Sequence, residues 1–293
     1  MPSPAEAYSI PTEKYFQEDA EGNINFLDPI TGDTLKPDKI PESLLQDDEL
    51  RSGFDFILKN SHRINFTLML SSHLGPNNLA EAGIDLRGVA ERLRTSNGVL
   101  FLEHSDKRAR KPEKDVLGAK QFNSELGSQL SNTQIRVAFP DFSRHSDRPS
   151  DQALTAWWQA IEDTASTEEL TQHGFENALL RQVAMYAGFQ SYRDWYLVGK
   201  IGAKLSEFDS QDALNENIEA AMLVGSHHPG IGDLLKSAGA KVELQGIHDE
   251  RLNWYDNEIV HVISTSKIST DDRKWLTRAL VKTTSELNSQ INQ

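Results

Sequence analysis

One pattern constrains the fold of this chain most: from Phe54 onward, short apolar runs alternate with longer amphipathic stretches. This alternation is typical of strands joined by helical crossovers, and strands that are buried on both faces are almost continuously apolar. It predicts an α/β fold, mainly a parallel sheet with helices on both faces. We expect strands at 65–70, 98–102, 135–139, 221–224, 241–244 and 258–263, and helices at 79–93, 177–189, 192–205, 230–239 and from Asp271 onward.

The first 50 residues have a different character. Residues 1–50 hold twelve acidic and three basic residues and six of the eleven prolines of the chain. Such a segment buries little apolar surface, so we expect an acidic, extended or loosely packed arm that precedes a single α/β domain over residues 51–293. Removal of about the first 40 residues should leave that domain folded. Within the arm, Asp28-Pro29 and Gly32-Asp33 lie between apolar residues and predict a small turn or hairpin.

Composition excludes several classes of function. The formal net charge of −14 repels phosphate backbones and anionic lipid headgroups, which argues against nucleic-acid and membrane-surface partners. The sequence has no cysteine, so disulfides, cysteine-ligated metal centres and cysteine nucleophiles are excluded. The N-terminal residues lack the features of a signal peptide, and no run approaches the roughly 18 apolar residues that a membrane span needs. We therefore expect a cytoplasmic protein without a membrane partner.

Two of the expected strands end in similar turns. The segments FTLMLSSHLG at 66–75 and AMLVGSHHPG at 221–230 both place His-x-Gly after an apolar run. Small residues let the backbone turn sharply there, so His73 and His228 should project over the carboxyl ends of the strands, where open α/β sheets bind ligands. The alternative is that each histidine caps a turn or bonds a backbone carbonyl.

Acidic residues follow two further strands. Glu103 comes directly after the run from Val99 to Leu102, and Asp141 follows the next strand by one proline. A carboxylate at the end of a buried strand must be solvated, meet a cation or have a raised pKa. Together with the two histidines, these residues predict a polar site at the carboxyl ends of the strands. The simpler alternative for Glu103 is a side chain that points into water.

Three features occur in this order along the chain: the strand-end Glu103, the pair Arg193-Asp194 on an expected helix, and a late Gly-Ser-His-His-Pro-Gly turn at 225–230. With these features the chain resembles the clan that joins erythromycin esterases, the haem-binding lipoprotein ChaN, and the TraB/PrgY and Tiki-type proteins. The early turn departs from the clan pattern, because Leu70 stands where a Gly-x-x-His motif has glycine. The motifs are closest to those of the TraB and Tiki-type members.

This resemblance implies a hydrolase that acts on a small molecule or a peptide. His73 and His228 would bind a divalent ion or act as general bases on water, and Glu103 would serve as a ligand or proton acceptor. Imidazoles with a carboxylate suit Zn, Mn, Co or Fe. Arg193 would position an anionic group of the substrate or a developing oxyanion. The alternative for Arg193 is a surface side chain paired with a neighbouring acid.

A second hypothesis keeps the fold without the chemistry. The protein would then be a non-catalytic binding protein that holds haem or another ligand, or a protein partner. His227 beside His228 and His104 beside Glu103 are further candidate ligands for such a cofactor. Each of these two histidines has the alternative of a surface imidazole.

Overall fold

The computed structural model describes residues 14–18, 24–36, 39–71, 83–103, 135–138, 140, 146–164, 175–225, 228 and 230–246. These residues group into two compact units. The first holds the described residues up to Ser43 and those from Ser146 to Tyr192, and the second holds the remainder. Helix α8 (Phe175–Ser210) contributes its earlier part to the first unit and its later part to the second.

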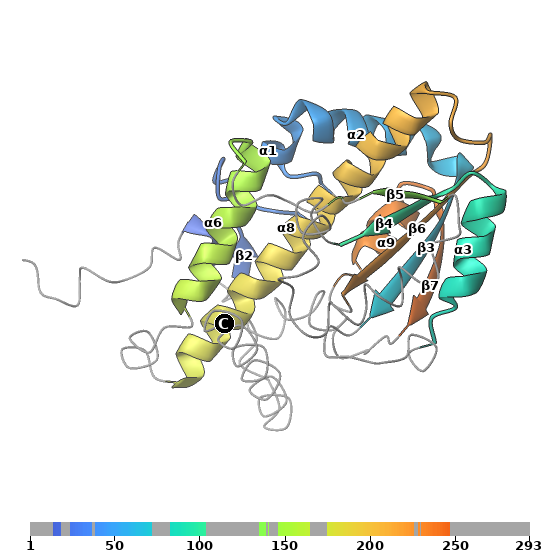
Figure 1. Ribbon diagram of the computed structural model, residues 1–293. Helices are drawn as coiled ribbons and strands as arrows, with labels where there is room; N and C mark the ends of the chain where they lie inside the picture. Colours follow the sequence, from blue (N-terminus) through green and yellow to red (C-terminus); the bar gives the residue numbers. More distant parts are fainter. Residues whose placement is uncertain are drawn as a thin grey trace, which may run out of the picture. The chain divides into compact units, whose positions relative to one another are not determined.

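The second unit is built on a parallel five-stranded sheet (Figure 1). The strand order is β5-β4-β6-β3-β7, and each adjacent pair is parallel. This arrangement confirms the predicted α/β fold. The strands are β3 (Ile64–Ser71), β4 (Val99–Leu102), β5 (Arg136–Ala138), β6 (Ile218–Gly225) and β7 (Lys241–Gly246).

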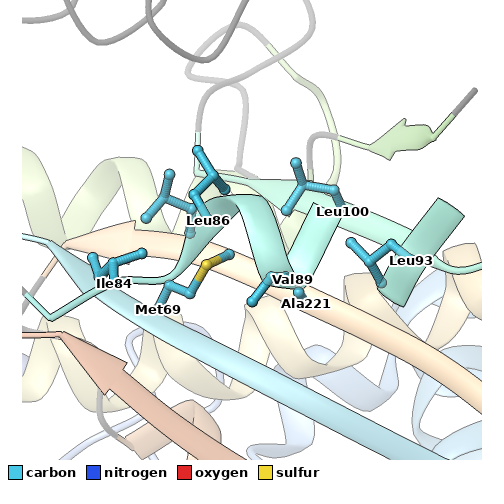
Figure 2. Packing of buried hydrophobic residues seen from close by; sticks show 8 residues of the cluster. Met69, Ile84, Leu86, Val89, Leu93, Leu100 and Ala221 are labelled. Carbon is cyan, nitrogen blue, oxygen red and sulfur yellow. The ribbon is translucent and has the colours of Figure 1, made fainter. Parts of the chain in front are cut away.

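Helices cover both faces of this sheet. Helix α3 (Leu86–Thr95) belongs to a buried cluster that includes Met69, Leu100 and Ala221 (Figure 2). On helix α9 (Gly230–Ser237), a methyl group at Gly232 would meet Leu68 and Val242. Leu68 and Met69 are consecutive strand residues and point to opposite faces, so α3 and α9 lie on opposite faces.

The direction of the crossovers explains this placement. The chain passes from β3 through α3 to β4 in one direction along the sheet, and from β6 through α9 to β7 in the other. Crossovers between parallel strands are almost always right-handed, so opposite directions put the two helices on opposite faces.

Asp47 caps the N-terminus of helix α2 (Asp48–Asn60), because its side chain accepts hydrogen bonds from the backbone N–H groups of Glu49 and Leu50. The same helix approaches α8 closely within the second unit. A methyl group on Gly53 would lie 1.9 Å from the carbonyl oxygen of Gly199, so only glycine fits at this contact. A short 3₁₀ turn, η3 (Ser61–Arg63), links α2 to β3.

The first unit contains an antiparallel pair, β1 (Phe16–Glu18) and β2 (Ile24–Phe26), with helix α6 (Pro149–Thr164). The predicted turn is present, because Leu27 and Thr34 form an antiparallel bridge around it. Asp28 is completely buried there, and its carboxylate accepts hydrogen bonds from the N–H groups of Ile30, Thr31 and Ser43.

The described part of the acidic segment is therefore packed. The boundary between the two units follows Ser43 and lies inside helix α1 (Glu42–Leu45), whereas the sequence pattern placed a boundary at residue 50. Tyr15 packs against Trp157 with ring centroids 4.8 Å apart, and the Ser43 and Tyr192 hydroxyls lie 2.6 Å apart. A few well-placed apolar and hydrogen-bonding side chains outweigh the charged composition of this segment.

The observed elements refine the predicted ones. The helices expected at 177–189 and 192–205 form the single helix α8. The strand expected at 258–263 and the helix expected from Asp271 lie outside the described residues. In the part of the chain that the structure describes, no helix has the length and apolarity needed to cross a membrane.

Candidate functional site

Four polar side chains from three elements meet at the carboxyl ends of β4 and β6. Glu103 is the residue after β4, Arg193 and Asp194 lie on α8, and His228 follows β6 by three residues. We call these four residues the polar cluster. Because all four belong to the second unit, their arrangement is defined within one body.

The polar cluster occupies a special position in the sheet. β4 and β6 are neighbours, but the chain continues from β4 to β5 in one direction and from β6 to β7 in the other. In open α/β sheets, ligands bind at the carboxyl ends of strands where the connections diverge in this way. The topology therefore places the polar cluster where such folds form sites.

Glu103 connects β4 and β6 to α8. Its Oε1 accepts a hydrogen bond from Nη2 of Arg193 at 3.0 Å, and its Oε2 accepts one from the backbone N–H of Gly225 at 2.8 Å. Its own backbone N–H donates to the carbonyl of Leu223. The side chain of Glu103 is 11% exposed and that of Arg193 is 10% exposed. The carboxylate is thus paired with a cation, as one of the sequence alternatives required.

His228 lies between the two residues of α8. Its Nδ1 is 2.5 Å from Oδ1 of Asp194, and its Nε2 is 3.0 Å from Nη1 of Arg193. Oε1 of Glu103 lies farther from Nε2, at 3.6 Å. The residue is 1% exposed, so the imidazole is almost completely enclosed.

The charges of the polar cluster shift two pKa values. Burial is the largest single influence and disfavours a charged His228 ring, as does the nearby Arg193, but the charge and hydrogen bond of Asp194 and the bond to Glu103 together raise the pKa of His228 to about 9. Burial raises the pKa of Asp194, and the nearby His228 opposes that rise. Both effects follow from enclosing several ionisable groups in one small volume.

The Arg193 contact and the raised pKa describe different protonation states of His228. A guanidinium only donates hydrogen bonds, so the 3.0 Å contact requires an Nε2 without a proton. A pKa of about 9 places a proton on that nitrogen at neutral pH. Within the polar cluster two carboxylates face one guanidinium, and we therefore take the ring as protonated near pH 7. The Arg193 contact then describes the ring after Nε2 has lost its proton.

The structure brings together three of the residues that the sequence singled out: Glu103, Arg193 and His228. The other four, His73, His104, Asp141 and His227, lie outside the described residues. Asp194 entered the sequence reasoning only as the neighbour of Arg193, and its bond to His228 requires the three-dimensional fold. The adjacent Arg-Asp pair before a strand that ends in His-His-Pro-Gly was the available signal.

The metal hypothesis finds little support in these contacts. Arg193 lies within 3.0 Å of both Glu103 and His228, so a cation already contacts two of the three expected ligands, and the third, His73, lies outside the described residues. The second oxygen of Glu103 and the second nitrogen of His228 also have partners. Within the described ranges, no three His, Cys, Asp or Glu residues are grouped so as to hold a metal ion. The described donors do not fit a divalent ion in this arrangement.

The haem hypothesis also finds little support in the described histidines of this unit. Both nitrogens of His228 are engaged, and His62 is exposed at the opposite end of β3, in the turn before that strand.

The comparisons with known proteins add no neighbour, because no family model, curated protein or solved structure matches the chain.

Proposed function

We propose that this protein is a hydrolase in which the polar cluster activates water through His228 rather than through a metal. The substrate class is an ester or amide of a small molecule or peptide, as the resemblance to the erythromycin esterase clan implies. The observation that carries the proposal is the enclosed contact of Arg193 with Glu103 and His228. It lies at the carboxyl ends of β4 and β6, where the connections to the next strands run in opposite directions. Buried ionisable groups with shifted pKa values in such a position are typical of active sites.

In this proposal, Arg193 binds the substrate carbonyl oxygen with Nη1, which gives up its contact with Nε2 of His228. Nε2 then takes a proton from water, the resulting hydroxide adds to the carbonyl carbon, and Arg193 stabilises the oxyanion. When the bond to the leaving group breaks, the imidazolium returns its proton to the leaving oxygen or nitrogen. Glu103 holds Arg193 in place through its Oε1.

The test is hydrolysis of a panel of chromogenic carboxylic esters and fluorogenic peptide amides. We expect His228→Gln to lower kcat/KM about 10² to 10⁴-fold, the range for a general base, and Arg193→Gln about 10² to 10³-fold, the range for an oxyanion donor. His62→Gln is the matched control, because His62 is exposed. Cleavage that survives both His228→Gln and Arg193→Gln would contradict the proposal.

Two further readouts separate this chemistry from metal catalysis. Dialysis against a chelator should leave kcat/KM unchanged. Because only the unprotonated ring accepts a proton, kcat/KM should rise with pH and level off near the pKa of about 9. Loss of activity on chelation that an added divalent ion restores would instead favour the metal-dependent mechanism.

A second candidate function is that of a non-catalytic binding protein with the same fold. The observation that favours it is the completeness of the polar cluster, in which both oxygens of Glu103 and both nitrogens of His228 already have partners. Such a cluster can serve to fix the fold. In that case Arg193→Gln and His228→Gln would lower Tm without a hydrolytic reaction to lose, and a Soret absorbance would identify haem as the ligand.

A further inference from the structure

The ring of His228 is held from both edges by consecutive residues of α8. Arg193 contacts Nε2 at 3.0 Å, and Asp194 contacts Nδ1 at 2.5 Å. A carboxylate accepts a hydrogen bond, so Nδ1 keeps a proton in both states of the ring, and Nε2, which faces Arg193 and Glu103, is the nitrogen that gains or loses one. Asp194 thus determines which nitrogen of His228 exchanges protons.

The Asp194 carboxylate lies against the first residue of α9. A methyl group added at Gly230 would be 2.4 Å from Oδ2 of Asp194, a separation that two such atoms do not adopt. Gly230 is not among the described glycines with positive φ, so its backbone conformation does not require glycine. Glycine is therefore required at position 230 because it leaves space for the Asp194 carboxylate.

The same position favours an ionised carboxylate. The first N–H groups of a helix lack partners within the helix and give its N-terminus partial positive charge. Burial of Asp194 to 4% exposure favours its neutral form and raises its pKa. The start of α9 and the proton on Nδ1 of His228 both act in the opposite direction and favour the anion.

We propose that Asp194 is a positioning residue for His228, and that Gly230 provides the space that lets the Asp194 carboxylate reach Nδ1. This inference deepens the proposed function, because it assigns the residue that orients the base. It concerns the free protein, however, and its test needs no substrate.

The first measurement is proton NMR of the full chain with ¹⁵N-labelled histidine. A histidine N–H bonded to a carboxylate gives a resonance far downfield of the amides, and its loss in His228→Gln assigns it. We expect this resonance to move upfield or disappear in Gly230→Ala. It should stay in place in Gly232→Ala, where the methyl group would lie 3.3 Å from a flexible Leu68 methyl. An unchanged resonance in Gly230→Ala would overturn the proposal.

The second measurement is a double-mutant cycle on Tm, which works even if Gly230→Ala is too unstable for NMR. Gly230→Ala should lower Tm by several degrees in the wild-type background, because its methyl group collides with Oδ2 of Asp194. In an Asp194→Ser background the oxygen is gone, and the same change should have little effect. Equal losses of Tm in both backgrounds would show that Gly230 acts independently of Asp194. A protein that passes both tests but hydrolyses nothing would refute the proposed function alone.

Discussion

At Nε2 of His228, one ring nitrogen faces both a cation and an anion. Arg193 can donate to it only when it has no proton, and Glu103 can accept from it only when it has one. Asp194 on the other edge of the ring fixes Nδ1 in both states. The presence or absence of a proton on Nε2 therefore decides whether this nitrogen interacts with Glu103 or with Arg193.

This arrangement predicts a pH-dependent stability. The pKa of His228 is raised from 6.5 to about 9 in the folded chain, so the protonated ring stabilises the fold fully below about pH 6.5, and this contribution is lost as the pH rises through 9. The loss is at most about 3 kcal/mol by linkage. We expect Tm from calorimetry to fall as the pH rises over this range. The fall should be smaller in His228→Gln, whereas Tm of His62→Gln should change with pH as in the wild type. A wild-type slope in His228→Gln would assign the pH dependence to other groups.

Glu103 and Arg193 form an ion pair that is largely buried, and its stability can be tested by removing the charge of Glu103. Glu103→Gln keeps the acceptor for Arg193 but removes the charge, and it leaves a guanidinium in a largely buried place. Breaking a buried ion pair in this way lowers the free energy of unfolding by about 3 to 5 kcal/mol. The loss should be smaller here, because both side chains are still about one-tenth exposed. Urea unfolding should show this loss for Glu103→Gln but little for Glu207→Gln, whose partner Lys204 is exposed. Equal losses in the two variants would contradict the assignment.

At the scale of elements, the contact between α2 and α8 depends on glycines that face each other. Gly53 approaches the backbone of Gly199, and a methyl group on Gly202 would lie 2.1 Å from the carbonyl oxygen of Gly53. Helix backbones that come this close leave no room for side chains, and a methyl group must push the helices apart. Because Arg193 and Asp194 lie on the same helix α8, this contact also helps to set the position of the polar cluster.

Gly53→Ala should therefore destabilise the protein although alanine is the better helix former. We expect a loss of at least about 1 to 3 kcal/mol in denaturant unfolding, the usual cost of overpacking, against a gain of about 1 kcal/mol from helix propensity. Ser52→Ala is the control on the same helix, because Ser52 is exposed. A stabilised Gly53→Ala variant would mean that the helices are not in close contact.

At the scale of the whole molecule, the described N-terminal residues belong to a packed unit. Tyr15, Phe26 and Leu27 are buried, and the buried Asp28 carboxylate holds the N–H group of Ser43. The composition of this segment predicted a removable arm, but composition does not reveal a few buried side chains.

We now expect deletion of the first 40 residues to lower the stability of the protein, in contrast to the expectation from composition. The deletion removes buried apolar side chains at about 25 cal/mol per Å² and leaves the Ser43 N–H without its acceptor. Tm from calorimetry should fall by at least about 4 °C, the effect of some 1 to 2 kcal/mol in a chain of this size. An unchanged Tm would restore the interpretation of a removable arm.

The sequence by itself determined the fold class and the positions of the candidate site residues along the chain. Apolar runs of the right length can be read locally, so the strands β3 to β7 were predicted to within a few residues. Glu103 and His228 were found for the same reason, because Glu103 follows an apolar run directly and His228 follows one by a short turn. Helix periodicity was also local, but it did not show that 177–205 forms one continuous helix.

Only the tertiary structure decided which of these residues meet. Glu103 and Arg193 are 90 positions apart, and His228 is 35 positions beyond Arg193, so their contacts depend on the strand order and on the path of α8. The role of Asp194 and the need for glycine at 230 also arise from this convergence. Side-chain identity sets what each group can do, but long-range packing sets its partners, and the partners determine the charge that each group carries.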